Sequence, residues 1–477
     1  MTSPSVTPAQ PLTRETYAAR EGRQASAAPV RIVHIGLGAF HRAHQAWYTA
    51  QVDPEGEWGI AAFTGRNATA AQELAPQGGL YTLIERSADG DSASVVPSIV
   101  EALDGADLDS FVDLLAASTT AIVTTTVTEP GYRLTSAAQP NLDDAAVRAD
   151  IDWLSAALGD EASPSLAGGP TTTLGRLVLG LHARRLAGGG PLAIIPCDNM
   201  PDNGAFVATG LTALANLVDP ATASWITGNV SFVSTSVDRI TPRTTSADID
   251  QAARISGWLD TAPVITEPFR DWVLSGDFPA GRPAWERAGA RFVDDIEPFE
   301  RRKLWLLNGA HSLLAYAGRL RGHQTVAAAI ADETCLAWVT AFWDEASRQL
   351  PEGLDLDEYR TSLLARFRNA RIEHQLAQIG VEGVTKLRVR VVDVLLAERA
   401  AGRDGRGGIR AIGSWLALVT AGTELPDAQA PAIATALASG DARDAALLRL
   451  IDARLAADES LLADLRAVAA EVVPTLV

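Results

Sequence analysis

Short β-branched runs alternate with helical stretches between residues 30 and 240, and this alternation constrains the fold more than any other feature of the chain. Short buried strands separated by helices are typical of βαβ units and a parallel sheet. The sequence therefore predicts an α/β fold with a mostly parallel sheet. The strand-like runs cover 30–36, 59–65, 119–127, 192–196 and 229–237, and the helical patterns cover 42–50, 107–117, 144–158, 171–187 and 203–218.

Two regions depart from this alternation. The strand-like runs at 80–86 and 93–100 leave no room for a helix between them, which predicts an antiparallel pair added to the sheet. After residue 295, apolar residues recur at spacings of three and four, which predicts a mainly α-helical second half. We expect a mobile N-terminal arm over 1–28, an α/β domain over 29–290 and a helical domain over 291–477. A cleft between two such domains is a usual place for a small-molecule site.

Charge and composition exclude several classes of protein. The 477 residues carry 40 basic and 58 acidic side chains, a net charge of −18, so the basic footprint of a nucleic-acid-binding protein is missing. The chain has neither an apolar run of about 18 residues for a membrane span nor the apolar core of a secretory signal. Cys197 and Cys335 are too few for a disulfide framework or a cysteine-based zinc site, so we expect a reduced, cytoplasmic protein.

The first strand leads into the run GLGAFH, which begins at Gly36. Pyrophosphate binds against backbone N–H groups only where no Cβ holds it off, so Gly36 and Gly38 fit the first two positions of a dinucleotide-binding turn. His41 stands at the third glycine position, so the fingerprint is incomplete, and the same pattern is often only a tight turn. The second strand ends without an acidic residue before Glu73, and Arg66 there is either a partner for a 2′-phosphate or a solvated arginine. The choice between NAD and NADP stays open.

Residues 300–312 read as one helix that carries polar side chains in an apolar pattern. On an α-helix Asn308 lies about 140° around from Lys303 and His311 about 80°, so the three share one arc. They form either a satisfied polar seam between helices or a catalytic set. Oxidation of a secondary alcohol needs a base, and a lysine can serve if burial or nearby cations lower its pKa. Asn308 can donate to the oxyanion, His311 can bind a neighbouring hydroxyl, and Glu300 can relay the proton to solvent.

Two strand ends carry further candidates. Asn199 follows the strand at 192–196, at the edge where open α/β sheets bind ligands. It is either a second oxyanion donor or part of a turn in which Asn203 caps the next helix. Asp238 ends the following strand, where it either pairs with Arg239 or orients the catalytic lysine.

Taken in order, these motifs resemble the polyol-specific long-chain dehydrogenase/reductase family, which includes mannitol 2-dehydrogenase and fructuronate reductase (D-mannonate oxidoreductase). The resemblance spans about residues 30–400. It implies an extended Rossmann-type dinucleotide-binding domain followed by a mainly α-helical substrate and catalytic domain, in a monomer or weak oligomer that transfers hydride without a metal. It rests on HIGLGAFHRAHQ (34–45), TVTEPGY (126–132), PCDNMPDNG (196–204), VDRITP (237–242) and the spacing of Lys303, Asn308 and His311.

The resemblance also implies roles for single residues. Lys303 matches the general acid/base, Asn199 and Asn308 the oxyanion donors, and His311 a substrate-positioning histidine. Glu300 matches a glutamate that gates proton exchange with solvent, and Asp238 an aspartate near the lysine. The resemblance puts Gly36, Gly38, Phe40 and Glu129 in the cofactor loops. With Arg66 and Asn67, which follow the second strand, these are the expected cofactor-binding residues.

The segment 366–390 bears on the substrate. Its pattern of His374, Lys386 and Arg390 looks more like the fructuronate reductase branch than the mannitol branch. A cation at the far end of the site suits the carboxylate of a uronate or aldonate, and Lys386 is the first candidate and Arg390 the next. The alternative interpretation is a solvated helix face.

We therefore expect a nicotinamide-dependent oxidoreductase, with NAD as the cofactor and NADP as the alternative. It interconverts a secondary hydroxyl and a ketone on an open-chain sugar derivative, with D-mannonate and D-fructuronate favoured over D-mannitol and D-fructose. A sugar-phosphate dehydrogenase and a non-catalytic nicotinamide-binding sensor are the rivals. The set of lysine, asparagine and histidine speaks against a sensor, since a protein that only binds the cofactor needs no tuned lysine.

Overall fold

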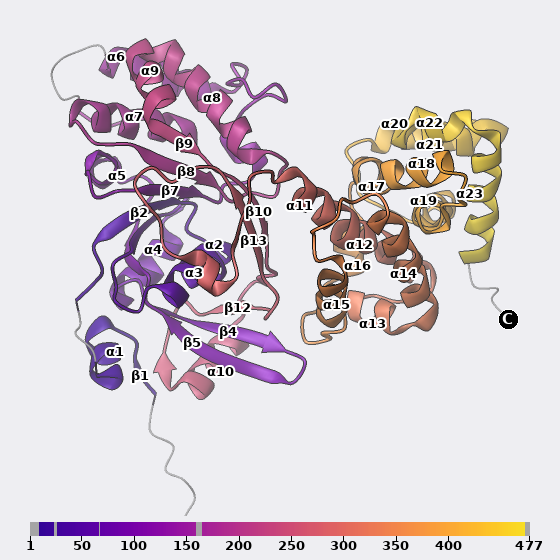
Figure 1. The fold of residues 1–477 in the computed structure, drawn as a ribbon, viewed down its shortest axis with the longest axis horizontal. Coiled ribbons are helices and arrows are strands. Elements are labelled where there is room, and N and C mark those ends of the chain that lie inside the picture. The colour runs from indigo at the N-terminus through magenta and orange to yellow at the C-terminus, as the bar shows by residue number, and fades with distance from the viewer. Residues whose placement is uncertain (1–8, 23–25, 66, 159–164, 473–477) are drawn as a thin grey trace, which may run out of the picture. The chain divides into compact units, whose positions relative to one another are not determined.

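The computed structural model describes residues 9–22, 26–65, 67–158 and 165–472 (Figure 1). The chain divides into two compact units, Met1–Ile296 and Glu297–Val477. The first unit is built around a β-sheet and the second is built of helices.

Six parallel strands form the main sheet of the first unit, in the order β6-β3-β2-β7-β8-β9. Ile32 in the middle strand β2 pairs with Ile60 on one side and Ile122 on the other. The strand order reverses between β2 and β7, which is the arrangement of a doubly wound sheet that binds dinucleotides where the order reverses. The strands are β2 (Val30–Ile35), β3 (Gly59–Phe63), β6 (Ile99–Leu103), β7 (Ile122–Thr125), β8 (Leu192–Pro196) and β9 (Val230–Phe232).

Both faces of this sheet are buried, because successive side chains of a strand point to opposite faces. Val33 and Ile35 of β2 join one apolar cluster with residues of three helices, α5 (Leu108–Ala116), α7 (Thr173–Leu186) and α8 (Asn203–Val218). Ile32 joins a second cluster with Trp47, Tyr48 and Trp272. The predicted mostly parallel sheet is therefore confirmed, with a hydrophobic core on each side.

Four of the five predicted helices agree with the structure to within two residues at each end. Capping side chains explain this agreement, since Asp107, Asp144 and Thr172 each accept hydrogen bonds from the first turn of a helix. The predicted cap at Asn203 is wrong, because Asp202 holds that position with φ +45°. The helices are α5 (Leu108–Ala116), α6 (Ala145–Ala157), α7 (Thr173–Leu186) and α8 (Asn203–Val218).

The helix predicted over 42–50 is broken at His44 into α2 (Ala39–Ala43) and α3 (Gln45–Val52). Tertiary contacts hold this break. The imidazole of His44 bonds the carbonyl oxygen of Asp271 at 3.1 Å, and its ring lies edge-on to Trp272. A local sequence pattern cannot report contacts to residues so distant in the chain.

The remaining strands form smaller sheets. The predicted antiparallel pair is confirmed as β4 (Tyr81–Ser87) and β5 (Gly90–Val96), but its predicted place in the main sheet is wrong. It forms a separate sheet with β12 (Val264–Thr266), and β6 takes the place in the main sheet. Pro97, which has no N–H for a strand ladder, separates β5 from β6.

The run predicted as one strand over 229–237 divides into β9 and β10 (Ser234–Asp238). β10 leaves the main sheet and pairs with β13 (Asp271–Ser275), which in turn pairs with β14 (Arg291–Phe292). Asp238 therefore ends a strand of a separate sheet. The further helices of this unit are α4 (Thr69–Leu74), α9 (Pro220–Asn229) and α10 (Ser246–Ser256).

Residues expected in the N-terminal arm include β1 (Gln10–Pro11) and α1 (Arg14–Glu21). β1 pairs in parallel with β11 (Trp258–Leu259). The Arg14 guanidinium donates to the carbonyl oxygens of Gly78, Pro97 and Ile99, which ties α1 to the first unit.

The second unit packs around α19, which contacts α14, α18 and α23. None of the helices in the described part of the chain is both long and apolar enough to cross a membrane. The α-helices are α11 (Glu297–Arg302), α12 (Ala310–Leu313), α13 (Val326–Ala331), α14 (Glu333–Ser347), α15 (Leu356–Phe367), α16 (Leu376–Ile379), α17 (Gly383–Leu387), α18 (Asp393–Ala400), α19 (Arg406–Thr420), α20 (Ala430–Leu437), α21 (Arg443–Ile451), α22 (Ala453–Ala457) and α23 (Glu459–Val472).

Arg184 on α7 is fully buried. Its side chain joins the segment that leads into β7 to the segment that leads into β8. Its guanidinium donates to the carbonyl oxygens of Leu115, Ala117, Thr120 and Gly190 at 2.7–2.9 Å. Removal of the guanidinium would take a hydrogen-bond donor from each of these carbonyl groups, of which Ala117 also accepts the N–H of Thr120 at 3.1 Å.

We expect Arg184→Met to lower the free energy of unfolding of the first unit by about 3 kcal/mol or more, because buried carbonyl groups lose their hydrogen bonds. Chemical denaturation followed by circular dichroism measures this change. Arg185→Met is the control, since Arg185 is partly exposed and pairs with Asp219, and its loss should cost at most about 1 kcal/mol. Equal losses in the two variants would contradict this account of Arg184.

Candidate active site

The turn after β2 has the geometry of a pyrophosphate cradle. Gly36 has φ +109°, and a Cβ there would lie 2.5 Å from the carbonyl oxygen of Thr126. At Gly38 a Cβ would meet only the Gly36 carbonyl oxygen, at 3.5 Å, so glycine leaves open space in front of the turn. The N–H groups of Gly36 and Leu37 both donate to the carbonyl oxygen of Phe63 in β3, each at 2.9 Å, and these bonds fix the turn. These residues fit a dinucleotide whose phosphates approach the backbone closely.

His41, at the third glycine position, packs flat against β2. Its ring lies 3.3 Å from that of His34, with an angle of 9° between the two planes. His34 bonds the hydroxyls of Thr124 at 2.8 Å and Thr126 at 3.2 Å. Burial lowers the pKa of His34 to about 3, and burial followed by the neighbouring His34 lowers the pKa of His41, so both rings are neutral. At this position the chain therefore has a buried aromatic stack between α2 and β2 in place of the third glycine of the complete fingerprint.

The other expected cofactor-binding residues lie around this turn or beyond β3 and β7. The half-buried Phe40 stacks on His44, with ring centres 5.1 Å apart. Asn67 is exposed and its side-chain oxygen accepts a hydrogen bond from Thr69, at the start of α4. Glu129 is exposed in a single 3₁₀ turn after β7. Arg66 lies outside the described residues.

Two expected catalytic residues lie in the first unit. Asn199 is exposed immediately after β8, at the carboxyl edge of the main sheet. Asp238 is half-buried at the end of β10. Arg239 donates to the carbonyl oxygens of Ala43 and Glu267 and forms its ion pair with Glu85. The structure thus gives Arg239 an acidic partner other than Asp238.

Lys303 begins a π-helical segment, Lys303–Gly309, in the second unit. The chain is helical there as predicted, but its winding is not that of one α-helix. Hydrogen bonds between residues five apart place such residues above one another, so Lys303 and Asn308 come to the same side of the helix. A second π-helical segment, Leu314–Gly318, follows α12, and such segments occur frequently at functional sites. Lys303 is 8% exposed and Asn308 is half-buried.

His311 lies on α12, one turn beyond Asn308, and is surrounded by cationic and aromatic side chains. Its ring centre is 5.0 Å from that of His374 and 4.9 Å from that of Phe367. Burial, followed by the charges of His374 and of Arg366, Arg390 and Lys386, holds the pKa of His311 well below its usual range. His311 is therefore neutral and available as a hydrogen-bonding group.

Arg390 and Lys386 approach this group from a neighbouring helix. Arg390 lies in the π-helical segment Arg388–Val392 and donates to the Asn308 carbonyl oxygen at 3.4 Å and the Ser312 hydroxyl at 3.2 Å. The Lys386 amine donates to the carbonyl oxygen of Ile379 at 3.0 Å. Burial, followed by Arg390, lowers the pKa of Lys386 to about 8, and burial lowers that of Arg390 to about 10.

The second unit therefore brings most of its expected site residues together. The neighbours are Asn308, His311, His374, Lys386 and Arg390, with Lys303 one π-turn before Asn308 and Glu300 half-buried on α11 just ahead of it. Sequence reasoning assigned no role to Arg366, which is 9% exposed. A charged residue inside the apolar pattern LLARF was the available indication.

The amino-acid composition gives a second indication of the site residues that the sequence analysis did not use. Among the 40 basic residues of the chain, Lys303 and Lys386 are the only lysines. Arginine and lysine are equivalent for a solvated surface charge but differ in shape and in the ease of losing a proton. Both lysines stand in the second unit, Lys303 buried at the start of its π-helical segment and Lys386 among the cations around His311, so neither is a fully solvated surface charge.

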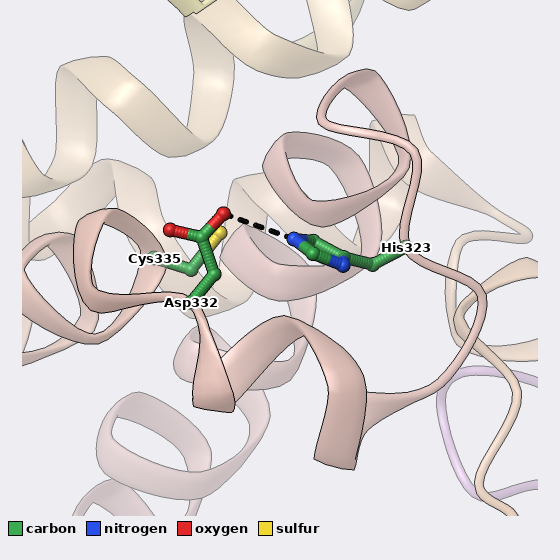
Figure 2. Close-up of side chains that lie close together, drawn as sticks. All are labelled: His323, Asp332 and Cys335. Atoms are coloured by element: carbon green, nitrogen blue, oxygen red, sulfur yellow. Dashed lines mark hydrogen bonds and ion pairs between the residues drawn. The ribbon is translucent and has the colours of Figure 1, made fainter.

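A different cluster of potential metal ligands lies elsewhere in the second unit (Figure 2). His323, Asp332 and Cys335 place ligand-type atoms within 4.8 Å of one another. The Asp332 carboxylate already bonds His323 at 2.9 Å, accepts hydrogen bonds from Nε and Nη2 of Arg321, and caps α14. Burial raises the pKa of the Cys335 thiol to about 11, so the thiol keeps its proton. These contacts describe an ion pair that anchors a helix end.

Comparisons with known proteins agree for both units of the chain. Residues 30–287 match the family model described as the mannitol dehydrogenase Rossmann domain, and residues 295–470 match the mannitol dehydrogenase C-terminal domain. D-mannonate oxidoreductase of Escherichia coli is 35% identical over 81% of this chain and 79% of its own. Mannitol 2-dehydrogenase of Aspergillus fumigatus is 38% identical over 75% of this chain and 71% of its own.

Solved structures show the same relationship. A substrate-free D-sorbitol dehydrogenase superimposes with a TM-score of 0.83, at 27% identity, over 94% of this chain and 95% of that one. Pseudomonas fluorescens mannitol 2-dehydrogenase, solved with NAD and D-mannitol, gives a TM-score of 0.74 at 30% identity over 93% and 92%. The Rossmann-type sheet, the helical second unit and these matches lead to one conclusion: the chain belongs to the mannitol dehydrogenase family of oxidoreductases.

Proposed function

We propose that this chain uses NAD to interconvert a secondary alcohol and a ketone on an open-chain sugar acid, with D-mannonate and D-fructuronate as the substrate pair. The observation that carries the choice of a sugar acid is the gathering of Lys386, Arg390 and Arg366 around the neutral His311. A carboxylate is the substrate group that such a cluster suits best. The related D-mannonate oxidoreductase supports the same choice.

The first unit is proposed to bind the cofactor. A Cβ at Gly36 would run into the Thr126 carbonyl oxygen, Gly38 leaves the space in front of the turn open, and the strand order reverses beside them. When bound, the nicotinamide ring accepts or returns the hydride. Phe40, Asn67 and Glu129 are proposed as further contacts, together with Arg66. The relative solved with NAD supports NAD over NADP.

Lys303 is proposed as the general acid/base. It is buried, and its π-helical segment places it on the same side as Asn308. In the oxidation, the Lys303 amine takes the proton of the substrate hydroxyl while the amide N–H of Asn308 donates to the developing oxyanion. Asn199 is proposed as the second oxyanion donor.

The remaining residues are proposed to position the substrate and the base. His311, being neutral, binds a hydroxyl next to the reacting carbon, with His374 packed against it. Glu300 passes the proton from Lys303 towards solvent, and Asp238 orients Lys303. Lys386 and Arg390 bind the carboxylate at the far end of the substrate.

The competing substrate pair is D-mannitol and D-fructose, which the relatives named mannitol 2-dehydrogenase favour. A polyol offers only hydroxyl groups, which do not need several cations. Removal of one cationic side chain should therefore distinguish the sugar-acid substrate pair from the polyol pair.

We expect the purified protein to oxidise D-mannonate or D-altronate with NAD, and not D-mannitol, D-arabinitol or D-sorbitol, in an assay of reduced nicotinamide absorbance with NAD and NADP in parallel. Lys386→Ala should lower kcat/KM for the sugar acid by about tenfold or more, because a charge-assisted hydrogen bond is lost. Arg368→Ala removes an exposed arginine of the same segment and should change little. A good rate on D-mannitol that survives Lys386→Ala would assign the chain to the mannitol pair, and cofactor binding without any turnover would favour a sensor.

The pH dependence follows from the pKa of Lys386, which burial and Arg390 lower to about 8. Lys386 is charged below this pH and neutral above it, so kcat/KM for a sugar acid should fall as the pH rises through about 8. Lys386→Arg keeps the charge and should remove this decline.

Because the chain has two lysines, lysine labelled with ¹³C at Cε gives two resonances, and Lys386→Arg identifies the one from Lys386. We expect this resonance to titrate near pH 8. A midpoint near 10.4, the ordinary value for lysine, would contradict the assignment.

A further inference from the structure

The side chain of Asp198 joins the two loops that follow β7 and β8. One carboxylate oxygen accepts the backbone N–H of Thr128 at 2.7 Å, and the other accepts the Tyr132 hydroxyl at 2.5 Å. Both partners belong to the turn 128–132 after β7, whereas Asp198 precedes Asn199 after β8. A single carboxylate therefore sets the position of one loop relative to the next.

The turn that Asp198 holds has a strained backbone. Thr128 has φ +68° and ψ 157°, a region that a β-branched residue rarely adopts. Its side chain is exposed, so the conformation is not imposed by burial of the threonine itself. The hydrogen bond from its N–H to Asp198 is a contact that keeps it there. Glu129, one of the expected cofactor-binding residues, comes next.

Asp198 is itself fixed on the other side. The N–H of the preceding Cys197 donates to Thr125 of β7 at 2.8 Å. The carbonyl oxygen of Asp198 accepts from the Asn203 amide at 3.0 Å, and the same amide donates to the carbonyl oxygen of Thr235 at 2.8 Å. The residue after Asp198 is the exposed Asn199, so these hydrogen bonds fix the backbone that leads into Asn199 at the sheet edge.

The carboxylate is 6% exposed. Burial raises its pKa, while the hydrogen bonds from Tyr132 and from the backbone of Thr128 act in the opposite direction. A carboxamide has the same shape and can make the same two contacts. Its oxygen can accept from Thr128, and its N–H₂ can donate to Tyr132, whose hydroxyl can in turn donate to Thr125, 2.5 Å away.

We propose that Asp198 is a positioning residue: it holds the strained turn at Thr128 and thereby fixes both Glu129 for the cofactor and Asn199 as an oxyanion donor. This inference rests on the proposed function for the role of Asn199, whereas the part that concerns the cofactor loop depends only on nicotinamide binding by the first unit.

The test compares Asp198→Ala, Asp198→Asn, Asn199→Ala and the double variant with alanine at both positions. Asn199→Ala should lower kcat by about a hundredfold, as for the loss of one oxyanion donor. Asp198→Ala should lower kcat to a similar extent. It should also lower the affinity for NAD several-fold, which quenching of protein fluorescence measures. The double variant should be no slower than Asn199→Ala alone, because both changes remove the same interaction. Asp198→Asn should retain kcat and NAD affinity within about threefold.

Two measurements separate a purely structural role of Asp198 from a positioning role. They are the melting temperature of the variants and the effect of relieving the backbone strain at residue 128. Thr128→Gly adopts a positive φ without cost, so in the Asp198→Ala background it should recover part of the lost NAD affinity. Additive losses of kcat in the double variant, or full activity of Asp198→Ala, would overturn the proposal. Another outcome is that the enzyme turns over no sugar acid or polyol, while Asp198→Ala still lowers the affinity for NAD and Asp198→Asn does not. The proposed function would then fail, but the role of Asp198 in holding the turn 128–132 would stand.

Discussion

Hydrogen bonds between neighbouring strand ends hold the candidate site of the first unit in shape. Parallel strands β2, β7 and β8 end at one edge of the sheet, but their backbone ladder stops there and the loops beyond need other partners. The Thr126 hydroxyl donates to the Gly36 carbonyl oxygen at 2.9 Å, and the Asp198 carboxylate accepts the Thr128 N–H. These two contacts join the turn at Gly36 to the end of β7, and the loop after β7 to the loop that carries Asn199.

The sequence predicted those parts of the fold that local patterns determine. The helix over 203–218 agrees residue for residue, because apolar spacing and turn residues are local properties. The break at His44 was not predictable, since a carbonyl of Asp271, far along the chain, holds it. The same is true of β10, whose run of β-branched residues reads as one strand with β9 although it joins a separate sheet.

For the candidate site, the sequence suggested which residues to examine, but not the geometry that relates them. Lys303, Asn308 and His311 drew attention by their chemistry. An assumed α-helix put Lys303 and Asn308 about 140° apart on one arc with His311 between them, whereas the π-helical segment brings the first two closer to the same side. No local pattern distinguishes hydrogen bonds to the fifth residue from bonds to the fourth. The burial of Arg366 beside His311 depends in the same way on packing between distant segments. The scarcity of lysine was readable from composition and needed no structure.

That Lys303 is the base is the central claim, and chemical rescue tests it most directly. Lys303→Ala should lose about a hundredfold to ten-thousandfold in kcat while it still binds NAD. Added small primary amines should restore part of the rate, in proportion to their concentration and increasing with their basicity, because they supply the missing acceptor for the hydroxyl proton. Loss of activity that no amine restores, or a Lys303→Ala variant that turns over near the wild-type rate, would contradict the account.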